Sequence, residues 1–197
     1  MFLKHFFHPH TLANVRALSA HFRVDRRHAE VVRRMARRIF NVLSPLHKLT
    51  AHDAHLLEYA AILHDIGFFI SPSAHHKHGA YIVRNSEIFG LSPFEQELVA
   101  VLVRYHRKAH PQLSHREYER LSVKERIRIM KLASILRCAD ALDRSHTGVM
   151  AEAGFELTER ELLIHAPPGV ESAEETSSLE KKGALLNEVF GITPIII

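Results

Sequence analysis

Apolar residues recur every three or four positions through the first three quarters of the chain, which is the spacing of an amphipathic helix. The pattern predicts helices over about 11–22, 25–43, 53–66, 78–86, 93–106 and 123–146. Short polar stretches join these segments. We therefore expect residues 25–146 to be helices joined by short loops, without a central sheet.

Capping signals support these boundaries. Three Ser–Glu pairs have the spacing of a capping box: Ser92 with Glu95, Ser114 with Glu117, and Ser122 with Glu125. Pro93 stands at the first position of its predicted helix, where proline is favoured. Asp25 and Asp53 are expected to begin the second and third helices, and Gly67 is a natural stop for the third.

The pattern changes after Gly148. Two short apolar runs, 155–157 and 162–164, predict a hairpin. A Pro-Pro-Gly break leads to a helix over about 173–190, and residues 193–197 predict a terminal strand. The expected fold is mainly all-α: a helical bundle over residues 1–148, with a small α+β appendage over 149–197 packed on it.

Composition limits the class of protein. The 197 residues suit one domain, and 46% hydrophobic residues are ample for a core. A single cysteine, Cys138, excludes an internal disulfide and favours a reducing cytoplasm. No apolar run approaches the roughly 20 residues that span a bilayer. The start of the chain is too short and too rich in histidine for a signal peptide, so we expect a cytoplasmic protein without a membrane partner.

Charge is distributed unevenly. Residues 1–50 carry ten Lys/Arg against two Asp/Glu, whereas residues 151–197 carry three against nine. The basic first quarter could attract a polyanion, or it could be one solvated helix face formed by Arg27, Arg33, Arg34, Arg37 and Arg38. No recognition-helix pattern is present, so nucleic acid is not the expected partner. A homodimer is an option that the sequence leaves open.

Seventeen histidines raise the question of a metal site, because histidine is the commonest metal ligand. His64 and Asp65 follow an apolar run at the end of a predicted helix. Adjacent helical residues point about 100° apart, so both reach one ion only beside the helix terminus. An imidazole and a carboxylate buried there need a partner. That partner is either a metal ion or a salt bridge.

Other helices supply matching residues. His28 is in register with the apolar face of its helix, where a hydrogen-bonded core histidine is the alternative. Asp140 shares a face with Leu136 and is expected to point inward. His28, His64, Asp65 and Asp140 thus predict a site for Mn, Fe, Co, Ni or Zn, and less clearly Mg. Asp143, one turn further, is expected to hold a ligand in place.

A second ion is a further hypothesis. His78 and His106 each lie on a later helix beside basic residues, and Asp65 could bridge two ions. Two metals about 3.5–4 Å apart would clamp a phosphoryl group. Exposed or hydrogen-bonding histidines are the alternative. His75 and His76 are expected at the surface or in contact with an anion.

The order H…HD…D resembles the HD superfamily of metal-dependent phosphohydrolases. More narrowly, three motifs resemble the C-terminal HD-like domain of the exopolyphosphatase/guanosine pentaphosphate phosphatase family: LLEYAAILHDIGFFIS, HHKHGAYIVRNSEIFGLSPFEQELVAVLVRYHRKAHP and LRCADALDRSH. The similarity runs from about Val15 to the stretch 188–191. It implies a helical module that, in full-length members, follows an actin-like catalytic part.

That catalytic part carries the family's phosphate-binding glycine loops and catalytic glutamate. This chain has eight glycines and no glycine-rich loop, so the family's activity does not transfer directly. Some family members have lost the HD metal ligands. The retention here of His28, His64, Asp65 and Asp140 favours a working metal site.

Two functions follow. The first is a metal-dependent phosphohydrolase acting on a nucleotide-type or polyphosphate-type substrate, with Asp65 and His64 as catalytic residues. Its substrate-binding cations would be Lys77, Arg84, Arg107, Lys108 and Arg144. The alternative is a non-catalytic module that binds polyphosphate or a nucleotide, or that partners a separate actin-like phosphatase.

Overall fold

The computed structural model describes residues 2–197, with side chains from His8 onward. The helices are α1 (Phe2–His21), α2 (Arg26–Val42), α3 (Ser44–His47), α4 (Ala51–Leu63), the 3-10 helix η1 (Ile66–Phe69), α5 (His75–Asn85), α6 (Pro93–Tyr105), α7 (Arg116–Glu119), α8 (Val123–Ala141), α9 (Ala173–Lys182) and α10 (Ala184–Phe190). The strands are β1 (Gly154–Leu157), β2 (Glu161–His165) and β3 (Thr193–Ile196). Within the described residues, strand occurs only after Gly148. The mainly helical class with a small C-terminal appendage is therefore confirmed.

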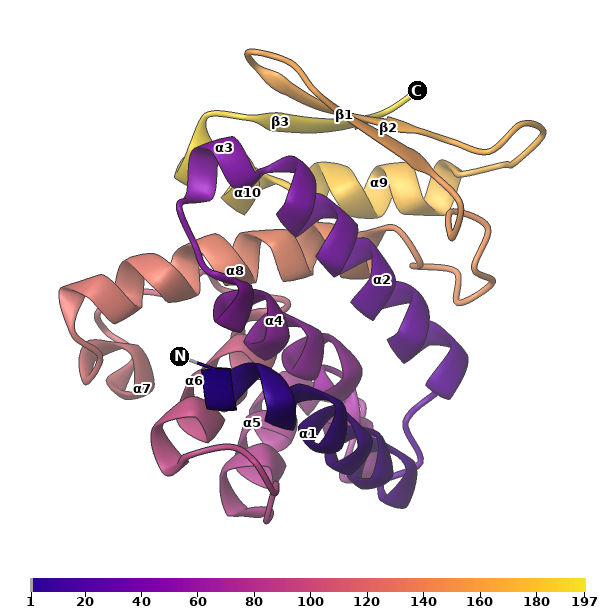
Figure 1. Cartoon of the computed structure of the whole chain (residues 1–197). Helices are drawn as coiled ribbons and strands as arrows, with labels where there is room; N and C mark the ends of the chain where they lie inside the picture. Colours follow the sequence, from indigo (N-terminus) through magenta and orange to yellow (C-terminus); the bar gives the residue numbers. More distant parts are fainter. Residues whose placement is uncertain (1) are drawn as a thin grey trace.

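The helices pack around α4. Helix α4 contacts α1, α2, α6 and α8, and α5 pairs with α6 on the far side (Figure 1). Met35, Ile39, Leu57, Leu102 and Leu136 are among the fully buried side chains at these contacts. They come from α2, α4, α6 and α8, so the elements that carry the predicted ligands share one core.

Two helix starts differ from the prediction. Thr50, rather than Asp53, is the N-cap of α4, and Asp53 is its capping-box partner. The predicted box at Ser114 does not form, because α7 follows His115 without a side-chain cap. The carboxylate that the box required, that of Glu117, instead pairs with Arg104 at 3.2 Å. The other two predicted boxes, which begin α6 and α8, are confirmed.

Gly67 is not the stop of α4, which already ends at Leu63. Its role is close packing. A Cβ on Gly67 would lie 1.9 Å from the carbonyl oxygen of His75 and 2.5 Å from the backbone nitrogen of Gly79. The absence of a side chain thus lets η1 and the start of α5 meet, which brings His75 close to the His64–Asp65 pair.

The appendage is a three-stranded sheet with two helices beneath it (Figure 1). Strands β1 and β2 form the predicted antiparallel hairpin, and β3 lies parallel to β2. The predicted helix over 173–190 is divided at Gly183, where a Cβ would lie 2.5 Å from the Pro194 side chain on β3. Helices α9 and α10 contact both β3 and α8, so the appendage packs directly on the bundle.

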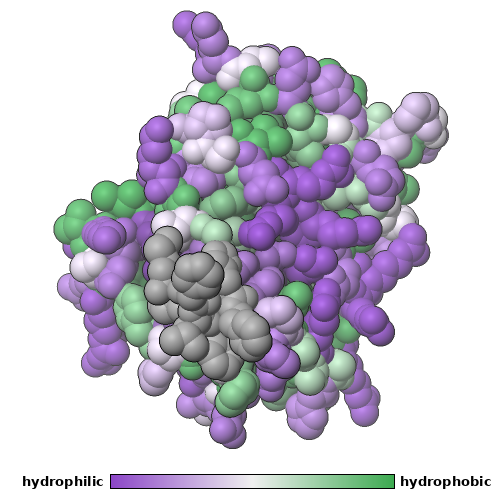
Figure 2. Space-filling model, in the orientation of Figure 1, coloured by the Kyte–Doolittle hydropathy of each residue, from purple (hydrophilic) through white to green (hydrophobic). Residues whose placement is uncertain are grey.

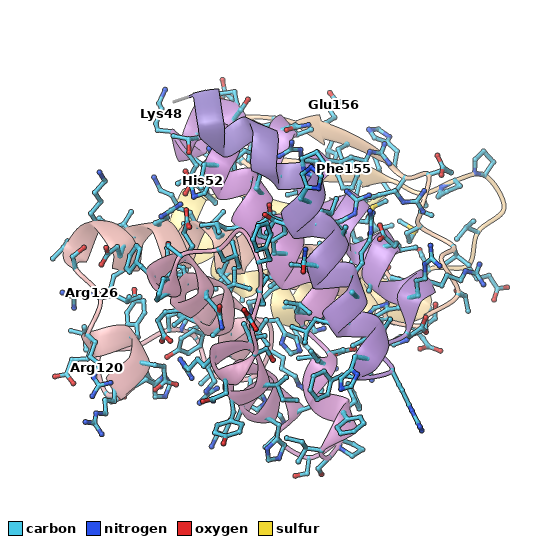
Figure 3. All side chains as sticks on the ribbon, turned by 60° about the horizontal axis from the view of Figure 1, so that its bottom comes forward. Lys48, His52, Arg120, Arg126, Phe155 and Glu156 are labelled. Atoms are coloured by element: carbon cyan, nitrogen blue, oxygen red, sulfur yellow. The ribbon has the colours of Figure 1, made fainter. Side chains whose placement is uncertain are left out.

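Helix α8 ends at Ala141, five residues before the predicted end. The carboxylate of Asp143 accepts a hydrogen bond from the backbone nitrogen of Gly148 at 2.7 Å, which turns the chain toward β1. At that strand the Arg38 guanidinium from α2 lies 4.9 Å from the ring centre of Phe155. Figure 3 labels Phe155 beside Glu156.

Hydrophilic side chains cover much of the face seen in Figure 2, including the region of α2. Within the described residues, no helix is both long enough and apolar enough to cross a membrane. The expectation that the chain has no signal peptide concerns Met1, which lies outside the described residues, and the following six residues, whose side chains are not described.

Candidate metal centre

Four buried histidines from four separate elements converge in the bundle. His28 lies on α2, His64 follows the last residue of α4, His75 begins α5, and His106 follows the last residue of α6. Each side chain is at most 3% exposed. Their Nε2 atoms face the carboxylates of two aspartates, one directly after His64 in the sequence and the other on α8.

The first group contains His28, His64 and Asp140, whose ligand atoms lie within 4.8 Å of one another. The Nε2 atoms of His28 and His64 are 3.1 Å apart. Oδ1 of Asp140 lies 3.8 Å from each of them. Oδ2 of Asp65 completes the group, 3.4 Å from His64 and 3.8 Å from His28.

The second group contains His75, His106 and Asp65. The two Nε2 atoms are 3.2 Å apart, and Oδ1 of Asp65 lies 3.2 Å from His75 and 3.7 Å from His106. The two carboxylate oxygens of Asp65 therefore face different histidine pairs. His78, the residue that we expected beside His106, is half-buried and outside this group, and His75 stands in its place.

Hydrogen bonds fix the orientation of all four rings. Nδ1 of His64 lies 2.7 Å from the carbonyl oxygen of Ala61, and Nδ1 of His106 lies 2.8 Å from that of Val103. Nδ1 of His75 lies 3.1 Å from a backbone carbonyl oxygen. Nδ1 of His28 is 2.8 Å from the carboxylate of Asp143. Since these partners accept hydrogen bonds, each neutral ring carries its proton on Nδ1 and a lone pair on Nε2.

This arrangement fits divalent cations. Two Nε2 lone pairs at 3.1–3.2 Å repel each other unless a proton or a metal ion lies between them. Carboxylates face both pairs and would complete a mixed nitrogen and oxygen donor set. Backbone carbonyls and the Asp143 carboxylate behind the histidines are the partners that orient metal-binding imidazoles in proteins.

Electrostatics distinguishes the two pairs. Burial alone would lower the pKa of His64, but the neighbouring carboxylates of Asp65 and Asp140 raise it to about 9. Burial, with the nearby charge on His64, lowers the pKa of His106 well below its usual value. In the absence of an ion, His64 therefore carries the proton between the first pair at neutral pH, while His106 is neutral.

Lys182 is a participant that sequence reasoning missed. Its ammonium group, on α9, pairs with the carboxylate of Asp140. Although burial opposes this change, Lys182 and His64 together lower the pKa of the Asp140 carboxyl. The position of Lys182 is fixed in part by the buried Arg137, which donates to its carbonyl oxygen at 3.4 Å and to that of Tyr105 at 3.2 Å.

The five cations expected to bind substrate lie in different surroundings. Arg107 lies beside the centre, with one guanidinium nitrogen 3.2 Å from both ring nitrogens of His75. Arg144 lines a cavity of about 550 Å³ together with Lys182. Lys77 and Lys108 are exposed. In the sequence, Lys77 comes two residues after His75, and Lys108 comes two residues after His106. Arg84 instead forms a two-bond ion pair with a glutamate on α6, at 2.7 and 2.8 Å.

Three residues of the centre were not found from the sequence. His75 was expected at the surface or in contact with an anion, and the helix that it begins was predicted to start only near residue 78. The close packing at Gly67 is the signal that could have placed it inside. Lys182 is brought in by packing of α9 on α8, which leaves no local pattern. The exposed His146 stacks on His28, with ring centres 3.7 Å apart, in a left-handed turn with φ of 56°.

Comparison with known proteins places the chain in a family. Residues 12–166 match the family model described as Ppx/GppA phosphatase, domain III. The guanosine-5'-triphosphate,3'-diphosphate pyrophosphatase of Aeromonas hydrophila subsp. hydrophila is 31% identical over 150 residues, which cover 75% of this chain and 30% of the relative. Relatives of the same name from Aeromonas salmonicida and Pseudoalteromonas atlantica are 30% and 29% identical.

The chain thus spans about 30% of the length of the curated relatives that it matches. Their names describe pyrophosphatases, whereas the matched family model describes one domain. Because that model covers well over half of this sequence, the chain belongs to the Ppx/GppA phosphatase family, in which it corresponds to domain III.

Proposed function

We propose that this chain is an HD-type, metal-dependent phosphohydrolase that acts on a phosphate ester or phosphoanhydride. The observation that carries the proposal is the position of Asp65, whose two carboxylate oxygens face two separate histidine pairs. A carboxylate in this position can bridge two ions. The relatives named as pyrophosphatases support a phosphoanhydride as the substrate class.

Ions bound here would polarise a phosphoryl oxygen and supply an acidified water. The chain's own residues have separate tasks. His28, His64, His75 and His106 present Nε2 lone pairs. Backbone carbonyls orient the rings of His64, His75 and His106, and Asp143 orients that of His28. Arg107, which lies beside His75, is proposed to neutralise a phosphate oxygen at the second pair. Lys77, Lys108 and Arg144 are proposed to act on more distant phosphates, and Arg84 is the weakest of the proposed contacts because Glu97 already neutralises it.

The proposal is tested by metal analysis of the purified protein, followed by a phosphate-release screen with Mn²⁺, Mg²⁺ and Co²⁺. Substrates should include nucleotides, guanosine pentaphosphate, polyphosphate and simple esters. We expect release with at least one ion. Asp65→Ala should abolish it while the helical circular dichroism spectrum is kept, because apolar side chains build the core.

A second candidate is a non-catalytic module that binds polyphosphate or a nucleotide, or that partners a separate actin-like phosphatase. The match to a single domain and to about 30% of each relative favours it. In this case the metal-loaded protein would release no phosphate from any substrate in the screen, yet it would bind polyphosphate in a salt-sensitive manner. That combination of results would contradict the hydrolase proposal.

A further inference from the structure

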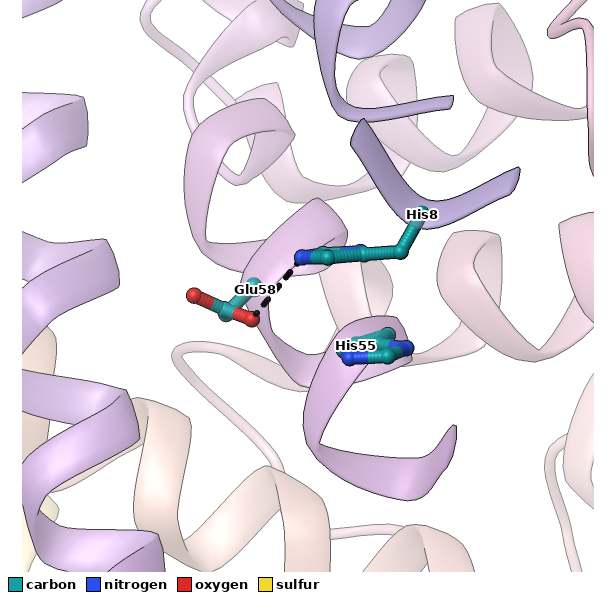
Figure 4. Close-up of side chains that lie close together, drawn as sticks. All are labelled: His8, His55 and Glu58. Carbon is teal, nitrogen blue, oxygen red and sulfur yellow. Dashed lines mark ion pairs between the residues drawn. The ribbon is translucent and has the colours of Figure 1, made fainter. Parts of the chain in front are cut away.

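A second group of potential ligands lies between α1 and α4, outside the centre described above. His8 of α1 meets His55 and Glu58 of α4, and their ligand atoms lie within 4.8 Å of one another (Figure 4). His55 and Glu58 are three positions apart on one helix, so their side chains share a face. His8 approaches that face from the neighbouring helix.

The carboxylate of Glu58 is oriented toward this group. Its Oε1 accepts a hydrogen bond from Arg33 at 2.6 Å. Its Oε2 is buried, accepts no hydrogen bond from the described residues, and lies 3.7 Å from Nε2 of His8. A buried carboxylate oxygen without a hydrogen bond is costly, and an ion at this point would satisfy it.

His8 is held in a suitable orientation. Its Nδ1 lies 2.8 Å from the hydroxyl oxygen of Tyr59, so its Nε2 is directed toward Glu58. A hydrogen-bonded Nδ1 with Nε2 turned to the ion is the usual arrangement of a metal-binding histidine. The rings of His8 and His55 are stacked, with centres 3.6 Å apart and planes 8° from parallel. Both can bind one ion after one ring turns out of the stack.

The surrounding charges allow a cation. Arg33 is shared between Glu58 and Glu30, with its Nε 2.8 Å from the second carboxylate. Arg37 lies 3.7 Å from Oε2 of Glu58, and its side chain is 34% exposed. It can therefore move into solvent when an ion enters.

We propose that His8, His55 and Glu58 form a Zn²⁺ site, the α1–α4 site, which joins α1 to the bundle. Two imidazoles and one carboxylate are a donor set that Zn²⁺ uses in proteins, with a fourth position open to water. None of the three residues belongs to the central histidine groups. The site therefore binds its ion independently of the proposed phosphohydrolase activity.

The test is a count of bound Zn²⁺. Chelator-treated protein is titrated with Zn²⁺, separated from free ion, and analysed for zinc per chain. His8→Ala and His55→Ala should each bind about one equivalent less than wild type. His10→Ala is the matched control, because His10 is exposed on the same helix one half-turn away. It should bind as much as wild type, and Asp65→Ala should lose zinc only from the central groups.

Limited proteolysis gives a second measurement that depends on the position of the ion. Zn²⁺ should slow cleavage within α1 in wild type and in His10→Ala, but not in His55→Ala. Circular dichroism checks that each variant is folded, and the half-buried position of His8 makes His8→Ala the safer substitution. The proposal is overturned if folded His8→Ala binds as much zinc as His10→Ala, or if zinc protects α1 equally in both.

Discussion

Lys182 on α9 forms an ion pair with Asp140 on α8, so the C-terminal appendage places a positive charge against the first histidine group. The ammonium group pairs with Oδ2 of Asp140, whereas Oδ1 of the same carboxylate faces His28 and His64. Lys182 therefore partly neutralises the carboxylate that a metal ion would meet, and its positive charge opposes the binding of a cation there.

Replacing Lys182 by alanine is expected to tighten metal binding. The variant removes a competing cation that lies against a proposed ligand, so Zn²⁺ affinity at pH 7 should rise several-fold. Lys181→Ala is the matched control, because the Lys181 ammonium group contacts Ser177 at 3.5 Å instead. Competition with a calibrated chelator measures both affinities. Equal affinity in the two variants would show that the ammonium group does not compete.

Gly67→Ala should destabilise the protein and disturb the second histidine pair together. The new Cβ would collide with the backbone of His75 and Gly79, which has little freedom to move. Overpacking of this kind costs about 1–3 kcal/mol. Urea unfolding measures the loss, and zinc analysis measures the effect on the pair.

Gly169→Ala is the control for Gly67→Ala. Its Cβ would meet nothing within 4 Å, so only its φ of +76° opposes a side chain. That strain costs about 1–2 kcal/mol, without any change in metal content. A Gly67→Ala protein that keeps its full zinc content would argue against the proposed role of the close packing at His75.

Lys108→Ala and Arg84→Ala should differ in their effects on an anionic substrate. Lys108 is exposed near His106 in sequence and is expected to make a charge-assisted contact worth about 1–3 kcal/mol. Arg84 is already neutralised by its ion pair with Glu97 of α6. Polyphosphate binding at two salt concentrations distinguishes them. A larger loss for Arg84→Ala would move the proposed anion surface to the Arg84 side.

Local rules were sufficient for most of the fold. The capping boxes at Ser92 and Ser122, and the hairpin between β1 and β2, depend on residues close in sequence, and both are confirmed. The shift of the α4 N-cap to Thr50 is also a local effect. It was missed because Asp53 fits either role in a capping box.

Long-range packing explains what the sequence could not predict. His75, His76 and His78 have similar local settings, and the contact between Gly67 and α5 decides that His75 faces Asp65. Lys182 reaches Asp140 through the packing of α9 on α8, and the neighbouring Gly183 lets β3 pack closely at the end of α9. Neither contact leaves a periodic signal.

Metal binding should release a proton and strengthen as pH rises. With a pKa of about 9, His64 is protonated in the ion-free protein at neutral pH, and this proton must leave before Nε2 can bind an ion. The apparent affinity should therefore rise about tenfold for each pH unit below 9, and level off above it. His106, whose pKa is lowered well below its usual value, should add nothing to this slope near neutral pH.

The stability of the ion-free protein should change with pH in the opposite direction. The folded-state pKa of His64, about 9, is above the value of about 6.5 for an unfolded histidine. Its contribution to the free energy of unfolding is therefore complete below pH 6.5 and is lost as pH rises toward 9. Saturating Zn²⁺ replaces the proton, and an unfolded histidine is also neutral above about pH 6.5, so stability should then be nearly constant over the same interval. Urea unfolding at pH 6.5, 7.5 and 8.5, with and without Zn²⁺, measures both trends. Parallel trends would mean that the proton on His64 and the metal ion do not compete for Nε2.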